Sequence, residues 1–360
     1  MNHRSIERGP PRSISGLASA SVVLTPSAAS AHVKWFCGAI DLTSSPVPFF
    51  HVLSPIFMVC CVGFLLLVFT GLVADGWLAR LRPMLLSTHG RLAWVEEAIV
   101  RIGIGAYCLL LWDNAASVPW GHIDEVVLTP ELLGHDWVID GLQGAVAVLV
   151  LSRLTCPLAA LALTGLIGIG VGRYGIFHMT DYVFFVGYAA YLALTPWSGW
   201  SVRRWRLPIL GTSLGFSLMW TAIEKFLYPQ WTSTIMATHP NIAAGFPIPD
   251  VVVIAGFVEF SLAFYLVVGR GLLRVGALAL MVVFISAMPE FGHLDVVGHI
   301  PIIAILMAVV VRGATPFQEA LRLPTQGPRS NAIAICGLYL VTLFGMMAAY
   351  YGLQHTVGWI

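Results

Sequence analysis

Residues 55–74 form the stretch Pro55-Ile-Phe-Met-Val-Cys-Cys-Val-Gly-Phe-Leu-Leu-Leu-Val-Phe-Thr-Gly-Leu-Val-Ala74, which contains no charged side chain. A run of about 20 apolar residues is the length that an α-helix needs to cross the hydrocarbon core of a bilayer. Residues 332–351 form a second charge-free run of the same length. These two runs predict membrane-spanning helices near the two ends of the chain.

The composition of the whole chain agrees with these runs. Of its 360 residues, 58% are apolar and only 10% are charged, and the mean hydropathy is +0.84. A soluble domain carries about 25% charged residues. We therefore expect the lipid bilayer to be the solvent and main partner of most of this chain. The formal net charge of +1 gives no reason to expect nucleic acid as a partner.

Further apolar segments between these runs are also long enough to cross a bilayer. We predict an all-α polytopic integral membrane protein with about ten transmembrane helices. The ten segments lie near residues 53–74, 93–112, 137–155, 156–173, 178–196, 208–226, 250–268, 271–288, 294–311 and 332–351.

The N-terminal residues 1–31 resemble a cleaved signal peptide. Three arginines are followed by the mildly apolar residues 14–24, and Ala29-Ser-Ala31 supplies the small residues that signal peptidase requires. Cleavage after Ala31 would leave His32 as the first residue. Its α-amino group and imidazole could then chelate Cu(II), or His32 could simply follow the cleavage site.

The positions of the basic residues predict the orientation. With His32 outside, only Lys34, Arg173 and Lys225 fall on the outer side. Such a bias is typical of the positive-inside rule, so we expect a bacterial inner membrane protein with both mature termini on the outer, periplasmic side. The predicted inner loops hold Arg80, Arg82, Arg91, Arg153, Arg203, Arg204, Arg206, Arg270, Arg274, Arg312, Arg322 and Arg329.

The middle of the chain shows an internal duplication. Pro130 precedes Asp140 by ten residues, and Pro240 precedes Asp250 by ten residues, with each aspartate opening a predicted span. Since each unit has four helices, the two units should face the same way, related by an axis along the membrane normal. The fourth helices also begin alike, with His178-Met-Thr-Asp181-Tyr-Val and His293-Leu-Asp295-Val-Val.

The duplication divides the chain into five parts. One helix precedes the two repeats and one follows them. The parts are the signal peptide 1–31, an outer segment with the first helix and an inner loop at 32–91, the first repeat at 92–204, the second repeat at 205–315, and a loop with the last helix and an outer tail at 316–360.

The second repeat carries the motifs Trp220-Thr-Ala-Ile-Glu224-Lys225-Phe-Leu-Tyr-Pro229, Gly256-Phe-Val-Glu259-Phe and Gly292-His293-Leu. In this order they resemble the DoxX-like family of four-helix bacterial membrane proteins. The resemblance covers about residues 205–315. It is weaker over 92–196, where the Glu-Lys pair and the mid-helix glutamate are missing. It implies a link to quinone-dependent sulfur oxidation or other envelope redox systems, with a quinone as ligand and envelope redox proteins as partners.

Charged residues inside the predicted spans are the first functional candidates, because ionisable groups in a bilayer are costly. Glu259 lies in mid-span, where it could carry a proton, hydrogen-bond a quinone carbonyl, or tie helices together through Lys225. Glu224 and Lys225 are adjacent, so they should point in different directions. One could face Glu259, although we expect Lys225 to reach water as an interfacial anchor.

The second span holds another charged pair. Glu97 and Arg101 are four residues apart with the glutamate first, which is the favourable order for an ion pair on a helix. This spacing is more typical of a structural pair than of a catalytic one. The neighbouring Glu96 lies close enough to the inner end to reach water.

Histidines and aspartates on the outer side form the metal candidates. His299 lies four residues after Asp295 and can share its helix face, whereas His293 and Asp295 do not share one. His178 and Asp181 could form a second half-site. With His32, these groups suit a copper or zinc ion, or they are interfacial hydrogen bonds that fix loops.

Three functions remain open from the sequence. The first is a component or accessory of a quinone-linked envelope redox system. The second is a transporter or metal-handling protein that uses the outer His and Asp groups, and the third is a structural membrane partner without chemistry. No H-E-x-x-H, Walker A or G-x-S-x-G motif occurs, so the sequence does not define an independent enzyme.

Overall fold

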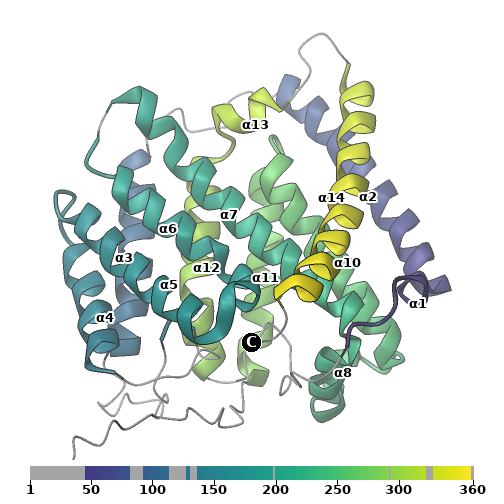
Figure 1. Ribbon diagram of the computed structural model, residues 1–360. Coiled ribbons are helices and arrows are strands. Elements are labelled where there is room, and N and C mark those ends of the chain that lie inside the picture. The colour runs from purple at the N-terminus through teal and green to yellow at the C-terminus, as the bar shows by residue number, and fades with distance from the viewer. Residues whose placement is uncertain are drawn as a thin grey trace, which may run out of the picture.

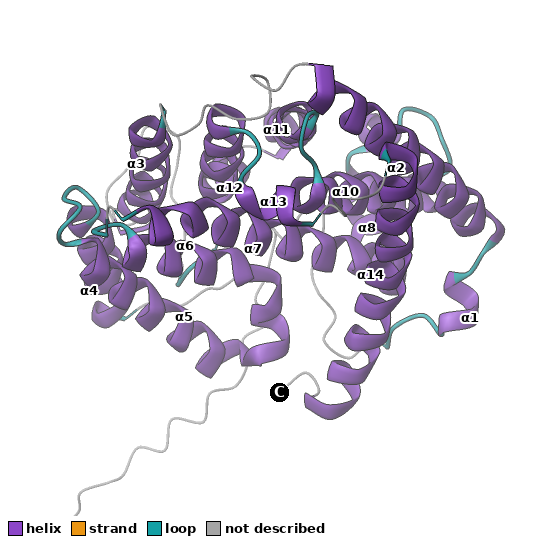
Figure 2. Ribbon diagram, turned by 90° about the horizontal axis from the view of Figure 1, so that it is seen from above, coloured by secondary structure: helices purple, strands orange, loops and turns teal. Residues whose placement is uncertain are grey.

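The computed structural model describes residues 45–81, 92–112, 127–129, 136–197, 199–291, 293–321 and 327–357. Within these residues the chain is all-helical and contains no strand (Figures 1 and 2). The helices are α1 (Phe49–Val52), α2 (Pro55–Leu81), α3 (Ala93–Trp112), α4 (Trp137–Leu149), α5 (Cys156–Met179), the 3₁₀ turn η3 (Thr180–Tyr182), α6 (Val183–Leu194), α7 (Trp200–Leu227), α8 (Pro229–Thr238), α9 (Pro240–Ala243), α10 (Ile248–Val268), α11 (Leu273–Phe291), α12 (His293–Arg312), α13 (Pro316–Ala320) and α14 (Pro328–Val357).

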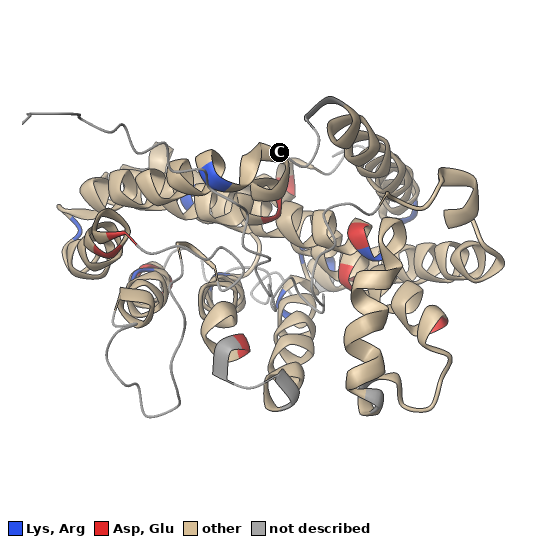
Figure 3. Cartoon of the chain, turned by 60° about the horizontal axis from the view of Figure 1, so that its bottom comes forward, with Lys and Arg blue, Asp and Glu red and all other residues tan. Residues whose placement is uncertain are grey.

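The described helices are compatible with a membrane protein in their length and composition. Figure 3 shows that positively and negatively charged residues are sparse, and that most of each helix carries neither. Five stretches are long and apolar enough to cross a bilayer, namely Pro55–Arg80, Cys156–Leu194, Ile248–Val268, Asp295–Arg312 and Pro328–His355. Two further apolar helices, α4 and α11, are shorter.

The long apolar stretch Cys156–Leu194 is divided into two helices that pack against each other. Gly175 has a φ of 78°, a left-handed conformation that glycine adopts without strain, and it kinks the end of α5. The turn η3 then leads into α6, which lies beside α5. The division agrees with the predicted boundary between the segments 156–173 and 178–196.

The packing order of the helices differs from their order in the chain. Neighbours in sequence pack together from α3 to α6, and α11 packs on α12. In addition, α6 packs along α7, and α12 packs along the distant α3. Helices α2 and α14, from opposite ends of the chain, lie side by side at one edge of the molecule, while α3 and α4 lie at the other (Figure 1).

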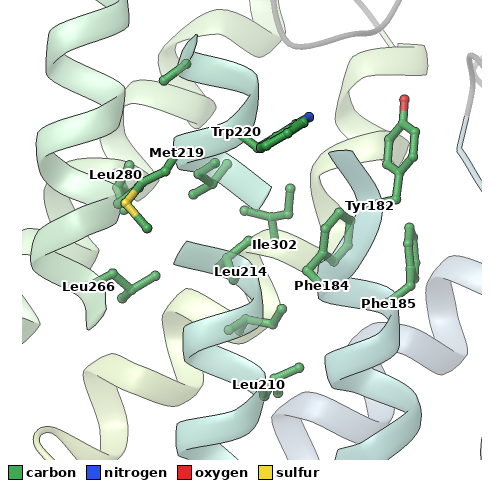
Figure 4. Close-up of a cluster of buried hydrophobic side chains, with 14 of the residues drawn as sticks. Tyr182, Phe184, Phe185, Leu210, Leu214, Met219, Trp220, Leu266, Leu280 and Ile302 are labelled. Atoms are coloured by element: carbon green, nitrogen blue, oxygen red, sulfur yellow. The ribbon is translucent and has the colours of Figure 1, made fainter. Parts of the chain in front are cut away.

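The interior is apolar and closely packed. One buried cluster contains Leu210 and Leu214 of α7, Phe184 of α6 and Ile302 of α12 (Figure 4). Small residues also let helices approach closely, because a Cβ atom on Gly103 of α3 would collide with the side chain of Ala304 in α12.

Several helices differ from their predicted bounds. Helix α2 continues past residue 74 to Leu81. The charged Asp75 does not end it, because Asp75 is buried and its Oδ1 accepts hydrogen bonds from the Tyr265 hydroxyl at 2.5 Å and the Leu272 amide at 2.7 Å. The short helices α8 and α9, which the hydropathy pattern does not predict, connect α7 to α10.

Candidate functional site

Lys225 and Glu259 form a buried ion pair between α7 and α10. The Lys225 Nζ lies 2.7 Å from Glu259 Oε2, and the two side chains are 1% and 6% exposed. An unpaired charge in such surroundings would cost several kcal/mol, of order 3–5, whereas hydrogen bonding between the partners offsets that cost. The pair therefore ties the end of α7 to the middle of α10.

The expectation that Lys225 reaches water as an interfacial anchor is wrong. Helix α7 ends at Leu227 because Pro229 follows, and the residue before a proline avoids the helical conformation. The chain turns there into α8, which packs against both α7 and α10. The end of α7 is thus covered by protein, and Lys225 turns inward to Glu259.

Glu224 points to a different helix from Lys225, as predicted for adjacent residues. Its Oε1 accepts a hydrogen bond of 2.8 Å from the hydroxyl of Tyr350 in α14. The ring of Tyr350 lies 5.0 Å from that of Trp220, which stacks on Phe216 at 5.9 Å. The carboxyl of Asp181 lies within electrostatic range of the Tyr350 hydroxyl.

Trp220 is the polar group of this cluster with an unused donor. Its side chain is buried, and its indole N–H has no hydrogen-bond acceptor among the residues that the structure describes. The indole nitrogen points to the side of the cluster on which Tyr182 lies (Figure 4). A buried donor without an acceptor costs about 1–3 kcal/mol, so this N–H is available to a ligand oxygen.

An open apolar groove follows the same face of α7 as Trp220. It has a volume of about 440 Å³, and Phe216 forms part of its wall. Since Phe216 also stacks on Trp220, the groove and the aromatic cluster share one ring. The groove is lined by Val183, Trp205, Pro208, Ile209, Thr212, Ser213, Phe216 and Phe317.

At the opposite end of α7 lies a second charged group, which we call the Arg–Glu network. It consists of Glu96, Glu97, Arg101, Arg153, Arg206 and Arg312. Three of its arginines meet one carboxylate.

The predicted ion pair between Glu97 and Arg101 is confirmed, with 3.3 Å between Oε1 and Nη1. Glu97 Oε1 also lies 2.8 Å from Arg153 Nε, and its Oε2 lies 3.1 Å from Arg206 Nη1. Arg101 further donates to the carbonyls of Val150 and Leu151, at the end of α4. Glu97 thus joins α3 to α7 and to the turn between α4 and α5.

The expectation that Glu96 reaches water is also wrong. Its side chain is buried, with Oε2 2.7 Å from Arg312 Nε and Oε1 accepting a hydrogen bond of 2.9 Å from the Tyr191 hydroxyl. The close packing of α12 against α3 brings Arg312 to it and excludes water. The sequence does not indicate this partner, because more than 200 residues separate the two positions.

The metal candidates are only partly described. Asp295 and His299 share a helix face as predicted, with Nδ1 of His299 3.2 Å from Asp295 Oδ2. His178 is buried, with its ring near those of Tyr174 and Tyr182. Among the described residues, no three His, Cys, Asp or Glu side chains gather as a metal site would require. His32 and the side chain of His293 lie outside the described residues, so the copper or zinc site stays a prediction.

Several buried polar residues are absent from the sequence-based candidates. Asp75, Tyr265, Tyr350 and Arg206 are all buried and hydrogen-bonded or ion-paired. Asp75 could have been found, because it is the charged residue that directly follows a charge-free run. Tyr350 carries no such signal, since a tyrosine near a helix end is ordinary in membrane proteins.

Comparison of the chain with known protein families, curated proteins and solved structures finds no match.

Proposed function

We propose that the protein is a membrane component or accessory of a quinone-linked envelope redox system, and that the groove along α7 binds an isoprenoid quinone. The observation that carries the proposal is the shared ring of Phe216, which joins an open apolar groove to a buried aromatic cluster with an unused indole donor. Ligand sites are commonly apolar hollows with a few convergent polar groups.

The two parts of such a ligand suit the two parts of the site. An isoprenoid tail would replace lipid against the apolar wall of Trp205, Pro208 and Ile209. A quinone ring can stack on Trp220, and its carbonyl oxygen can accept the indole N–H. Because Trp220 is buried, the ring of Phe216 must turn aside to admit the headgroup.

Glu259 has a different role in this proposal from the one that the sequence left open. Its pairing with Lys225 at 2.7 Å favours a tie between helices over direct contact with the quinone. Tyr350, whose ring lies 5.0 Å from that of Trp220, supplies the hydroxyl of the cluster, and Glu224, which accepts its hydrogen bond, supplies the carboxyl. The role of Glu259 as a proton carrier stays a hypothesis.

The duplicated architecture is also part of the proposal. We infer ten spans in a bacterial inner membrane, with two parallel four-helix repeats at residues 92–204 and 205–315. The packing of the helices supports this proposal. The first helix of the first repeat, α3, packs against the last helix of the second, α12, and the first helix of the second repeat, α7, packs against the last helix of the first, α6. Two parallel repeats related by an axis would exchange these two contacts. Gly103 of α3 and Ser213 of α7 lie 110 residues apart, as Asp140 and Asp250 do, and each lies at one of these close contacts.

The quinone proposal is tested by binding of a photoreactive ubiquinone analogue to the protein in detergent. We expect saturable labelling of α7 near Trp205 to Phe216. Thr212→Trp should abolish it by filling the groove, and Trp220→Phe should weaken binding about fivefold, the worth of one hydrogen bond of about 1 kcal/mol.

Trp94→Phe is the matched control, because Trp94 is an exposed residue of α3 and lines no part of the groove. Labelling that is unchanged in Thr212→Trp, or lost equally in Trp94→Phe and Trp220→Phe, would contradict the proposal.

A further inference from the structure

Three arginines share the carboxylate of Glu97, whose single negative charge can neutralise only one of them. Arg101, Arg153 and Arg206 all lie within 3.3 Å of its two oxygens. Glu96, the other carboxylate of the Arg–Glu network, is paired with Arg312. Among the described residues of the network, two positive charges are therefore left without a carboxylate.

The protein supplies neutral acceptors in place of the missing anions. Arg101 and Arg153 donate to backbone carbonyls, including that of Thr195 at 3.2 Å from Arg153 Nη2. Arg206 is almost fully buried, and its Nε has no acceptor in the described part of the chain. Carbonyl dipoles orient a guanidinium but do not cancel its charge, so the network favours an anion nearby.

Of the three arginines paired with Glu97, Arg153 is the one that an anion can reach. Its side chain is 47% exposed, against 16% for Arg101 and 2% for Arg206. It lies in the turn between α4 and α5, where Leu151 and Leu154 are 76% and 83% exposed. Exposed leucines on both sides of an arginine suit the membrane interface, where apolar side chains enter the acyl region and a guanidinium stays at the headgroups.

We propose that Arg153 and the Arg–Glu network bind the phosphate of an anionic phospholipid headgroup. The negative charge of the lipid offsets the charge that Glu97 leaves, and the phosphate oxygens accept hydrogen bonds from the outer edge of Arg153. The flanking leucines identify a lipid as the source of the phosphate, because a soluble phosphate ion has no apolar part to cover them. This site is independent of the quinone groove.

The proposal is tested with the whole protein purified in detergent. Its thermal unfolding is followed with added phosphatidylglycerol, phosphatidylcholine or inorganic phosphate. A ligand that binds only the folded protein raises the unfolding midpoint, and at a given concentration a tighter ligand raises it more. We expect phosphatidylglycerol to raise the midpoint much more than phosphatidylcholine, and inorganic phosphate to have little effect.

Arg153→Gln should weaken phosphatidylglycerol binding about fivefold, which corresponds to about 1 kcal/mol for one basic residue at the interface. Arg153→Lys keeps the charge and should retain most of the binding. Arg173→Gln is the matched control, because Arg173 lies near the other end of α5 and is 36% exposed. Each shift is measured against the same variant without lipid, so a change in basal stability does not affect it.

Three results would overturn the proposal. Equal stabilisation by phosphatidylglycerol and phosphatidylcholine would show that no anionic lipid is selected. An equal shift with inorganic phosphate would assign the site to a soluble anion. Equal losses in Arg153→Gln and Arg173→Gln would show a general effect of charge.

Discussion

Lys225 and Glu259 illustrate what a buried charge requires inside a bilayer. Neither side chain can reach water, so each depends on the other for compensation at 2.7 Å. The pair need not raise stability relative to apolar residues, because taking both charges out of water is itself costly. What it does is make each partner indispensable to the other.

Removing one partner should therefore be worse than removing both. We expect Lys225→Met or Glu259→Met alone to lower the free energy of unfolding by about 3–5 kcal/mol, since each leaves a buried charge without its ion-pair partner. The double variant should recover most of this loss. Unfolding by SDS titration of the detergent-solubilised protein would measure the difference as a double-mutant cycle.

Arg173 and Asp136 provide the control pair. Their atoms are 3.9 Å apart and both side chains are more than a third exposed, so Arg173→Gln should change stability by less than about 1 kcal/mol. Additive losses in the Lys225 and Glu259 variants would show that the two charges do not depend on each other.

The sequence could predict such residues but not all of their partners. Glu259 stands out because it is charged within an apolar segment, and the i,i+4 spacing predicts the pairs Glu97–Arg101 and Asp295–His299. The contact of Glu224 with Tyr350 joins residues 126 positions apart. Its prediction requires knowing that α14 packs near the end of α7, which local spacing does not contain.

At the scale of the helices, small residues determine which neighbours can approach closely. A Cβ atom on Gly103 would collide with Ala304, and one on Gly187 of α6 would collide with Ser213 of α7. These are the contacts of α3 with α12 and of α6 with α7, which join the two predicted repeats. In a bilayer such packing replaces much of the hydrophobic driving force between helices.

Adding one methyl group at these contacts should separate the helices. We expect Gly103→Ala and Gly187→Ala to destabilise the protein by about 1–3 kcal/mol through overpacking. Gly168→Ala and Gly172→Ala on α5 are matched controls, because a Cβ there meets nothing within 4 Å. Unfolding in detergent is the measurement. Equal effects at all four glycines would mean that helix propensity, and not packing, governs the result.

Helix positions follow from hydropathy more readily than helix packing does. Each of the ten predicted segments overlaps a described helix, and five of the described stretches are long and apolar enough to cross a bilayer. The turn of the chain into α8 after Pro229 could not be found in this way. Helix α8 mixes polar and apolar residues, and only its cover over Lys225 explains why that side chain turns inward.

At the scale of the whole molecule, the arginines define two unlike ends. Arg101, Arg153, Arg206 and Arg312 gather at one end of the bundle, where α7 begins and α12 ends. The opposite end, where α7 ends, holds the carboxyl groups of Glu224 and Asp181. If the positive-inside rule applies, the arginine end faces the cytoplasm.

This orientation can be measured with single introduced cysteines. Of the six native cysteines, the five that the structure describes are buried, and the sixth, Cys37, is replaced by Ser so that it cannot be labelled. Ser152 lies in the exposed turn at the arginine end, and Asn241 is exposed at the other end. We expect a membrane-impermeant maleimide to label Asn241→Cys in intact spheroplasts, and to label Ser152→Cys only after the membrane is opened. The reverse pattern would place the arginines outside. In that case the headgroup site would face the outer leaflet, so the test also determines which leaflet must supply the lipid.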